Sequence, residues 1–512
     1  MEAGSALFES SHPFLFFDYF RIPYVVAPRA WAPAPDGFLG RVRTRPLDDG
    51  PPRLLSWPRV QGETGEHVAS LRWGRYRLGQ IPLFGRVFTD AEASGWLPTE
   101  GRLRRAEAIT DENGRRVASI WRADNGNVML PFDPAEAVAS LWSERYTGPS
   151  SLKAEVRRRA LMVYYLVRPV LPRSVQIAAR RRFTRFQGTR PFPSWPVETA
   201  LVDLYEWLFA EVVALAGRPV PWLAPWPNGS TWALVLTHDV ESQVGYERMH
   251  LLREPERKAG LASSWNFVPL RYRVDDATVR ALAAEGCEIG VHGLRHDGKD
   301  LGSLRKLRSR LPAMREYAAR WGAVGFRAPA TQRRWEWMPL LGFDYDSSYP
   351  DTDRYEPFPG GCCSYLPYMN RNTVELPITL PQDHTLFAIL QHRDETVWIE
   401  KARHIRDRGG MALVITHPDY ADDPRVVHGY GSLLREFRDD PSVWHAVPRE
   451  VSAWWRRRAG SRIEERDGAW LVRGPAEADG RVRFALPNEP ALSADRNDEA
   501  AAEDVAGAGL PP

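Results

Sequence analysis

A short apolar run that ends in ionisable side chains constrains this chain more than any other feature. Residues 232–236 are apolar and lead directly into Thr237, His238, Asp239, Val240 and Glu241. An apolar run of this length, bounded by polar residues, predicts a strand that is buried on both faces. Alternation along an extended strand places the carboxylates of Asp239 and Glu241 on the same side. The sequence therefore predicts two carboxylates at one strand end.

Two further apolar runs end in the same way. Residues 288–291 lead into His292 and His296, and residues 411–416 lead into His417. In parallel sheets and α/β barrels, functional side chains gather at the carboxyl ends of the strands. The three runs therefore predict one shared site.

Strand and helix patterns alternate from residue 232 to about 458. The expected strands are 232–238, 263–268, 288–292, 323–327, 343–347, 373–377 and 411–416, and the expected helices are 275–285, 300–320 and 395–408. This alternation fits an α/β barrel, complete or slightly short, better than a doubly wound sheet. No GxGxxG or GxxxxGK[ST] phosphate loop follows any of these strands, so a nucleotide site has no support.

The length of the chain, 512 residues, calls for more than one core. We expect a β-rich N-terminal domain at 1–150, a basic helical region with a Pro-rich linker at 151–228, the α/β barrel at 229–458, a small β appendage at 459–492 and a disordered tail at 493–512. Aromatic side chains of the first domain are expected in a buried core rather than on a sugar-stacking surface. The appendage is expected to be a hairpin of residues 469–473 and 481–486.

The region after residue 150 is rich in arginine. Its arginines include Arg157, Arg158, Arg159, Arg168, Arg173, Arg180, Arg181, Arg182 and Arg185. A basic, partly apolar helix can lie on an anionic membrane surface or bind phosphates. The favoured interpretation is a helix whose arginine stems cover apolar surface while the charged heads stay in water.

Charge and cysteine content exclude several classes of protein. The net charge is only +3, so we expect no nucleic-acid partner. The three cysteines are Cys287, Cys362 and Cys363. They are too few for a disulfide framework and lack the spacing of a structural zinc site.

The N-terminus has no basic region, and Asp18 and Arg21 interrupt its aromatic run, which argues against a signal peptide or membrane span. We expect a cytoplasmic protein.

The two histidines of the second run suggest a metal site. His292 and His296 stand four residues apart, and Gly293 occupies the position that glutamate takes in the HExxH motif. Such a pair alone is a weak signal. Together with a carboxylate from a distant strand end, it makes a three-ligand site with an open position, as in hydrolytic zinc enzymes. Whether Asp239 or Glu241 supplies that carboxylate stays open.

Four motifs occur in a characteristic order. They are Thr237 to Glu241, His292 to His296, Arg327-Ala328-Pro329, and Leu413 to His417. This series resembles that of the polysaccharide deacetylases, carbohydrate esterase family 4, with a NodB-type homology domain. The resemblance covers roughly residues 230–455.

The resemblance implies a distorted barrel of seven or eight strands, a divalent metal that is expected to be zinc, and hydrolysis of an N-acetyl or O-acetyl group. The roles that it implies are a base for Asp239, an acidic metal ligand for Glu241, paired metal ligands for His292 and His296, an orienting arginine for Arg327 and a general acid for His417. The implied partner is an acetylated sugar or glycan substrate.

The sequence also departs from the family pattern. Val240 fills the second position of the usual aspartate pair, and Ala330 replaces the aromatic residue after the arginine-x-proline motif. Residues 344–349 are only a vague counterpart of the fourth motif, which leaves the group that tunes His417 unassigned. Asp383 and His384, which follow the sixth expected strand, could reach the pocket, but a surface-loop position is the favoured interpretation.

Three functions are compatible with these observations. The first is a metal-dependent deacetylase that acts on an N-acetylated sugar or a glycan precursor. The second keeps the barrel and the metal and hydrolyses a small non-sugar amide or cyclic ureide. The third is a catalytically weak barrel with a binding or scaffold role in polysaccharide biosynthesis, a role for which the additional domains would serve.

Overall fold

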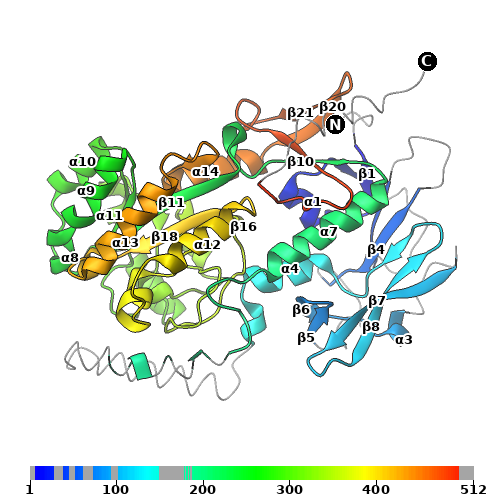
Figure 1. The fold of residues 1–512 in the computed structure, drawn as a ribbon, viewed down its shortest axis with the longest axis horizontal. Coiled ribbons are helices and arrows are strands. Elements are labelled where there is room, and N and C mark those ends of the chain that lie inside the picture. The colour runs from blue at the N-terminus through cyan, green and yellow to red at the C-terminus, as the bar shows by residue number, and fades with distance from the viewer. Residues whose placement is uncertain are drawn as a thin grey trace. The chain divides into compact units, whose positions relative to one another are not determined.

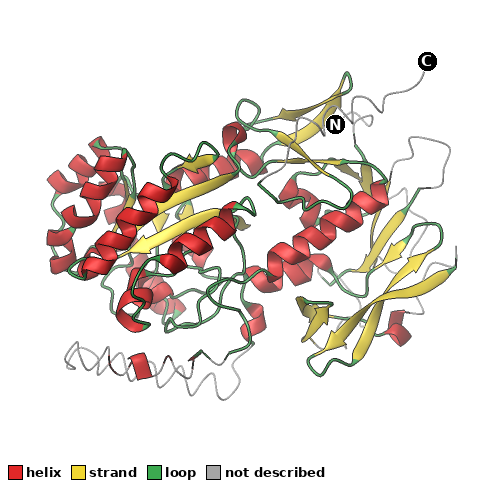
Figure 2. Ribbon diagram, viewed as in Figure 1, coloured by secondary structure: helices red, strands yellow, loops and turns green. Residues whose placement is uncertain are grey.

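Each of the two units of the chain is built around a sheet of its own (Figures 1 and 2). The computed structural model describes residues 6–27, 39–44, 52–60, 73–93, 102–148, 178, 180–182, 184, 187–188 and 190–494. The first unit comprises Met1–Tyr146, Thr199–Ala224 and Arg457–Pro512, and the second comprises Thr147–Glu198 and Pro225–Arg456. Most of the predicted basic stretch and of the predicted disordered tail lies outside the described residues.

The first unit contains a nine-stranded sheet with the order β2-β1-β3-β4-β9-β8-β7-β5-β6. Its strands are β1 (Phe8–Ser10), β2 (Tyr24–Val26), β3 (Leu39–Thr44), β4 (Leu54–Pro58), β5 (Trp73–Leu78), β6 (Ile81–Arg86), β7 (Leu103–Asp111), β8 (Arg116–Ala123) and β9 (Val128–Met129). Its helices are α1 (Leu15–Phe20), α3 (Asp90–Ala93), α4 (Pro134–Trp142) and α7 (Ala200–Ala216).

Aromatic side chains fill the core of the first unit. Phe20 of α1 lies 4.6 Å from Phe209 of α7 and 5.7 Å from Trp222, measured between ring centroids. All three side chains are buried. Phe20, which belongs to residues 1–150, is therefore part of the core, as expected for aromatics of that region, and is not available to stack on a sugar.

The predicted C-terminal hairpin pairs differently from expectation. Four strands are involved: β10 (Val220–Leu223), β20 (Arg462–Arg466), β21 (Ala469–Arg473) and β22 (Val482–Ala485). β21 pairs with β20, while β22 pairs with β10. Asp467 and Gly468 join β20 to β21 with φ values of 53° and 79°, the conformation of a tight Asp-Gly hairpin turn. The predicted pairing of 469–473 with 481–486 is wrong because the Asp467-Gly468 turn pairs 469–473 with β20 instead.

The second unit holds an α/β sheet with the order β16-β17-β15-β14-β13-β12-β11-β18, and β19 pairs with β11. Its strands are β11 (Trp232–Val240), β12 (Ser264–Phe267), β13 (Glu288–Val291), β14 (Gly325–Phe326), β15 (Tyr345–Asp346), β16 (Tyr368–Asn370), β17 (Thr373–Glu375), β18 (Met411–Thr416) and β19 (Val443–His445). All seven predicted strands are present, and the α/β class is confirmed. The sheet is a curled half-barrel, and among the described strands its end strands β16 and β18 do not pair with each other.

The helices of the second unit follow its strands along the chain. They are α8 (Gln243–Arg248), α9 (His250–Ala259), α10 (Asp276–Ala284), α11 (Leu304–Trp321), α12 (Thr396–Arg406) and α13 (Pro424–Phe437), and α14 (Pro448–Ala459) comes last. The three predicted helices correspond to α10, α11 and α12. Among the described residues, no helix combines the length and apolar character that crossing a membrane requires.

β11 is the strand that positions the site. Every one of its residues is buried, in agreement with its apolar sequence. It lies between β12 and β18, and all three strands are parallel. Thr237 donates a hydrogen bond of 2.6 Å from Oγ1 to the carbonyl of Val414 on β18. The carboxyl ends of the three strands therefore deliver their side chains to one edge of the sheet.

Candidate metal centre

Three side chains converge at the carboxyl edge of this sheet. Ligand atoms of Glu241, His292 and His296 all lie within 4.8 Å of one another. Glu241 follows β11, and both histidines belong to the loop after β13. The Nε2 atom of His296 is 2.8 Å from Oε1 of Glu241. This grouping meets the spatial requirement of a three-ligand metal site, with Glu241 rather than Asp239 as its carboxylate.

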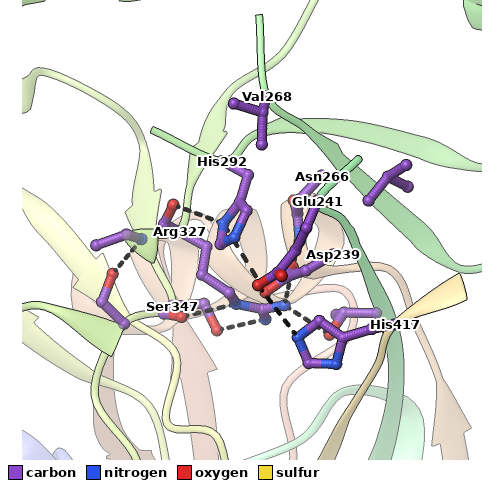
Figure 3. A network of polar contacts seen from close by, with 12 residues as sticks. Asp239, Glu241, Asn266, Val268, His292, Arg327, Ser347 and His417 are labelled. Atoms are coloured by element: carbon purple, nitrogen blue, oxygen red, sulfur yellow. Dashed lines mark hydrogen bonds and ion pairs between the residues drawn. The ribbon is translucent and has the colours of Figure 1, made fainter. Parts of the chain in front are cut away.

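His292 is held in the state that a metal ligand needs. Its Nδ1–H donates to the carbonyl of Arg327 at 3.1 Å, which leaves Nε2 as a free acceptor (Figure 3). The residue is only 2% exposed, and Nε2 has no hydrogen-bond partner in the described part of the chain. Burial lowers the pKa of His292 to about 4, so the ring is neutral at pH 7. A buried, unpaired imidazole nitrogen of this kind fits a metal ligand.

The loop after β13 turns back sharply to bring in His296. Gly293 has φ of +64°, and a Cβ atom there would lie 2.5 Å from Oδ2 of Asp300 and 2.6 Å from Cδ of Pro329. The same Asp300 oxygen accepts a hydrogen bond of 3.0 Å from the backbone N–H of Leu294. Only glycine fits this position, so the residue that replaces the HExxH glutamate has a structural reason to be there.

Asp239 lies beside the three ligands. Its Oδ1 accepts hydrogen bonds from Nη1 of Arg327 at 2.9 Å and from Nδ2 of Asn266 at 2.8 Å. Its Oδ2 lies 3.8 Å from Nδ1 of His292. Burial alone would raise the pKa of Asp239, but the charge of Arg327 prevails and lowers that pKa to about 2. The carboxylate is therefore ionised and fixed through one of its two oxygens.

Each of the three guanidinium nitrogens of Arg327 donates to a buried partner. Besides Asp239, Nη1 donates to Oγ1 of Thr237 at 2.9 Å. Nε and Nη2 donate to the carbonyl and the hydroxyl of Ser347, at 2.8 and 2.9 Å (Figure 3). A guanidinium held at three corners fixes the direction of the carboxylate that it contacts. This is the geometry expected of an orienting arginine.

His417 lies across the cluster from His292. Its Nδ1–H donates to Oδ1 of Asp383 at 2.6 Å, and its backbone N–H donates to Oδ2 of the same residue at 2.7 Å. Its Nε2 points toward Glu241, 4.0 Å from Oε1. Burial alone would lower the pKa of His417, but Asp383 reverses this effect and raises the pKa to about 10. His417 is therefore a protonated imidazole at neutral pH.

The expected surface-loop position of residues 383–384 is wrong for Asp383. Asp383 is fully buried and begins a short π-helical turn, η8 (His384–Ile389). This position was hard to predict, because a π turn has no α-helical periodicity and 34 residues separate Asp383 from His417. Asp383 is therefore the partner of His417 that the sequence analysis left unassigned.

Asn266 is a second site residue that the sequence analysis missed. It lies within the buried strand β12, directly across from Asp239 in the parallel register. An amide side chain between Trp265 and Phe267 was the available signal, since a buried amide needs a hydrogen-bond partner. Its partner is the Asp239 carboxylate.

His238 and Asp419 support the site from outside it. His238 is buried between Oγ1 of Thr416 at 2.7 Å and Oε1 of Glu256 at 2.5 Å, so it faces away from the three ligands. Asp419 accepts a 2.9 Å hydrogen bond from the backbone N–H of Glu241 through Oδ2. These contacts fix the backbone on either side of the strand end.

The chain was compared with known proteins. No protein-family model and no curated protein matches it. A putative polysaccharide deacetylase structure from Mycobacterium smegmatis matches at 21% identity and a TM-score of 0.38, over 47% of this chain and 93% of its own. A probable polysaccharide deacetylase from Pseudomonas aeruginosa matches at 17% identity and a TM-score of 0.38, over 46% and 94%.

The chain resembles polysaccharide deacetylases. The Puue allantoinase structure also matches, at 16% identity and a TM-score of 0.37, over 46% of this chain and 93% of its own. All three TM-scores lie below 0.5. The case for a function therefore depends on the side chains of the site.

Proposed function

We propose that this protein is a metal-dependent hydrolase that removes acetyl groups from an N-acetylated sugar or glycan precursor. The observation that carries the proposal is the convergence of Glu241, His292 and His296, whose ligand atoms lie within 4.8 Å of one another. Nε2 of His292 is buried and has no hydrogen-bond partner among the described residues, and Nε2 of His296 lies 2.8 Å from Oε1 of Glu241. Two imidazoles and one carboxylate suit a borderline divalent ion, and zinc is the expected one.

Asp239 and His417 provide the acid–base chemistry. When bound, the ion supplies Lewis acidity, which polarises a carbonyl and acidifies water. Asp239 is ionised and has Oδ1 occupied by Arg327 and Asn266, so Oδ2 can accept the proton of an attacking water. Protonated His417, held by Asp383, presents Nε2–H to the leaving atom.

The reaction balances with these groups alone. The water oxygen forms a bond to the acetyl carbon, and its proton passes to Asp239. The bond from that carbon to the sugar nitrogen then breaks, and His417 protonates the departing amine. The products are acetic acid, which ionises to acetate, and a free amino sugar. The proton that Asp239 took from water then passes to His417, directly or through solvent, and restores both groups for the next turnover. An O-acetyl ester would follow the same course with an alcohol as the leaving group.

Acetate release tests the proposal. Protein loaded with zinc, cobalt or manganese would be screened against N-acetylated and O-acetylated saccharides, with chelator-treated protein as the reference. In Asp239→Asn we expect acetate release to fall by about 10²-fold or more while metal content stays near that of the wild type. Asp439→Asn, at an exposed position, is the matched control and should leave activity unchanged.

Other outcomes identify the alternatives. Stoichiometric zinc without acetate release would favour a small non-sugar amide or cyclic ureide as the substrate. Absence of both metal and acetate release would leave a binding or scaffold role in polysaccharide biosynthesis. Either result would contradict a sugar deacetylase.

A further inference from the structure

The π-helical turn η8 connects the general acid to a distant part of the chain. Asp383 stands at its start, where Oδ1 accepts from the backbone N–H of His384 at 2.7 Å as well as from His417. The turn is closed by a hydrogen bond of 2.9 Å from Leu390 N–H to the Thr385 carbonyl. Carbonyls at the end of so short a turn lack partners within it and need donors from elsewhere.

Two arginines supply those donors. Arg181 donates from both Nε and Nη2 to the carbonyl of Ala388, at 3.0 and 2.9 Å. Arg425 of α13 donates from Nη2 to the neighbouring carbonyl of Phe387 at 3.2 Å. The last turn of η8 is therefore hydrogen-bonded by two arginines of the second unit, Arg181 of the predicted basic region and Arg425 of α13.

The residue before Arg181 reinforces this attachment. Arg180 contacts Oε2 of Glu356 at 3.5 Å, and Oε1 of that carboxylate accepts a hydrogen bond of 2.6 Å from Oγ1 of Thr385 in η8. Nε2 of Gln187 donates to the Glu356 carbonyl at 3.1 Å. Arg180 and Arg181 thus reach η8 by two separate routes.

Residues 188–194, which follow this basic stretch, are hydrogen-bonded to the loop that contains Thr352 and Arg354. Arg354 donates to the carbonyls of Gly188 and Pro193, at 3.0 and 2.7 Å, and Thr352 donates to the carbonyl of Ser194 at 2.5 Å. The Pro-rich stretch, residues 191–196, was predicted to be a linker, but its backbone is hydrogen-bonded to other residues of the second unit.

We propose that Arg181 is a positioning residue for His417, acting through η8 and Asp383. Its two hydrogen bonds to Ala388 fix the turn, and the turn fixes the direction in which the Asp383 carboxylate meets the imidazole. This inference depends on the proposed function, in which His417 protonates the leaving group. A small displacement of a proton donor costs much of its catalytic effect, so a contact remote from the substrate can matter.

Leaving-group dependence separates this role from a general loss of structure. An aryl acetate such as 4-nitrophenyl acetate releases a phenolate that needs no proton, whereas an N-acetylated saccharide releases an amine that does. In Arg181→Met we expect kcat on the N-acetylated saccharide to fall by about 10-fold or more, with KM within about twofold of the wild type. On the aryl acetate, kcat should change by less than about twofold.

Three comparison variants sharpen this test. Arg181→Lys keeps a charged donor and should recover part of the lost kcat. Asp383→Asn should give the same substrate dependence with a larger loss. Arg182→Met removes the neighbouring, exposed arginine and should behave as the wild type on both substrates.

Hydrogen exchange gives a readout that needs no turnover. Amides of residues 384–392 should exchange faster in Arg181→Met than in the wild type or in Arg182→Met. Equal losses on the two substrates, undiminished kcat on the saccharide, or unchanged exchange would each overturn the positioning role while leaving the proposed function intact. Wild-type protein that releases acetate from neither substrate would overturn the proposed function, and this role of Arg181 with it.

Discussion

At the scale of single residues, two buried aspartates of the site differ in their partners. Asp239 faces Arg327, whose permanent charge keeps the carboxylate ionised. Asp383 faces His417, whose imidazole it keeps protonated. The two environments place a proton acceptor, Asp239, and a proton donor, His417, in the same site, as hydrolysis of an amide requires.

The metal ligands give the first prediction. Replacing His292 or His296 by alanine removes one of three expected ligands, so each variant should retain on the order of a tenth or less of the zinc that the wild type binds. His428→Ala, at an exposed histidine outside the site, should keep the full amount. Metal content is measured on purified protein by inductively coupled plasma mass spectrometry. Near-stoichiometric zinc in both site variants would contradict the assignment.

The pH dependence of stability, which the His417–Asp383 pair should determine in part, gives the second prediction. In metal-free protein the pKa of His417 is raised from 6.5 to about 10, because Asp383 outweighs the effect of burial. The native state then binds one proton more than the unfolded state between these values. The stability that the pair contributes is fully present below pH 6.5 and is lost as pH rises toward 10, by at most about 1.4 kcal/mol per pH unit.

Urea denaturation of metal-free wild type and Asp383→Asn at pH 6, 8 and 10 checks this prediction. The difference in the free energy of unfolding between the two proteins should be largest at pH 6 and should shrink steadily toward pH 10. Taking the difference removes other titrating groups, which both proteins share. A difference that stays constant or grows with pH would count against the pair.

At the scale of elements, the loop after β13 gives the third prediction. In Gly293→Ala the new Cβ would overlap Asp300 and Pro329 in addition to adopting an unfavourable φ. Gly260→Ala meets the same φ cost, at φ of +70°, but its Cβ has nothing within 4 Å. We expect Gly260→Ala to lose about 1 kcal/mol of stability and to bind metal normally, and Gly293→Ala to lose more and to bind metal at least about tenfold more weakly. Thermal unfolding and zinc titration measure the two effects, and equal behaviour of the two variants would refute the steric argument.

The elements that the sequence predicted share one property. Strands β11, β13 and β18 are short apolar runs flanked by polar residues, and burial on both faces leaves such runs little choice of structure. Because their order is parallel, the three groups of ionisable residues had to meet at one edge, which is why Glu241 and the two histidines could be grouped in advance. α9 was not predicted, since Pro255 lies inside a mostly polar helix and weakens its pattern.

The sequence could not predict contacts between side chains on elements that lie far apart along the chain, because no local pattern indicates such contacts. Asn266 meets Asp239 only because β12 and β11 are neighbours in register. Asp383 meets His417 only because η8 packs beside the end of β18. The wrong hairpin has this cause only in part: β22 pairs with a strand far earlier in the chain, but the Asp467-Gly468 turn is a local signal for the pairing of β20 with β21. Such contacts follow from topology, which residue patterns constrain only in part.

At the scale of the whole molecule, the chain has two separate hydrophobic cores. The first unit is centred on rings such as Phe17, which is fully buried and lies 5.0 Å from Phe8 between ring centroids. The second is centred on β11 and its neighbours and contains every residue of the candidate metal centre. Units with separate cores can unfold separately.

The fourth prediction is that calorimetry resolves two unfolding transitions that respond to different changes. A ligand stabilises only the unit that binds it, by about 2.7 kcal/mol at a free concentration 100 times its Kd. Adding zinc should therefore raise the transition of the second unit, and chelator should lower it again. Phe17→Ala should lower the other transition, because deleting a buried phenylalanine costs about 3–5 kcal/mol, and should leave the zinc-sensitive one in place. A single transition that moves with both changes would mean that the two cores unfold as one, and that damage to the first unit reaches the metal centre.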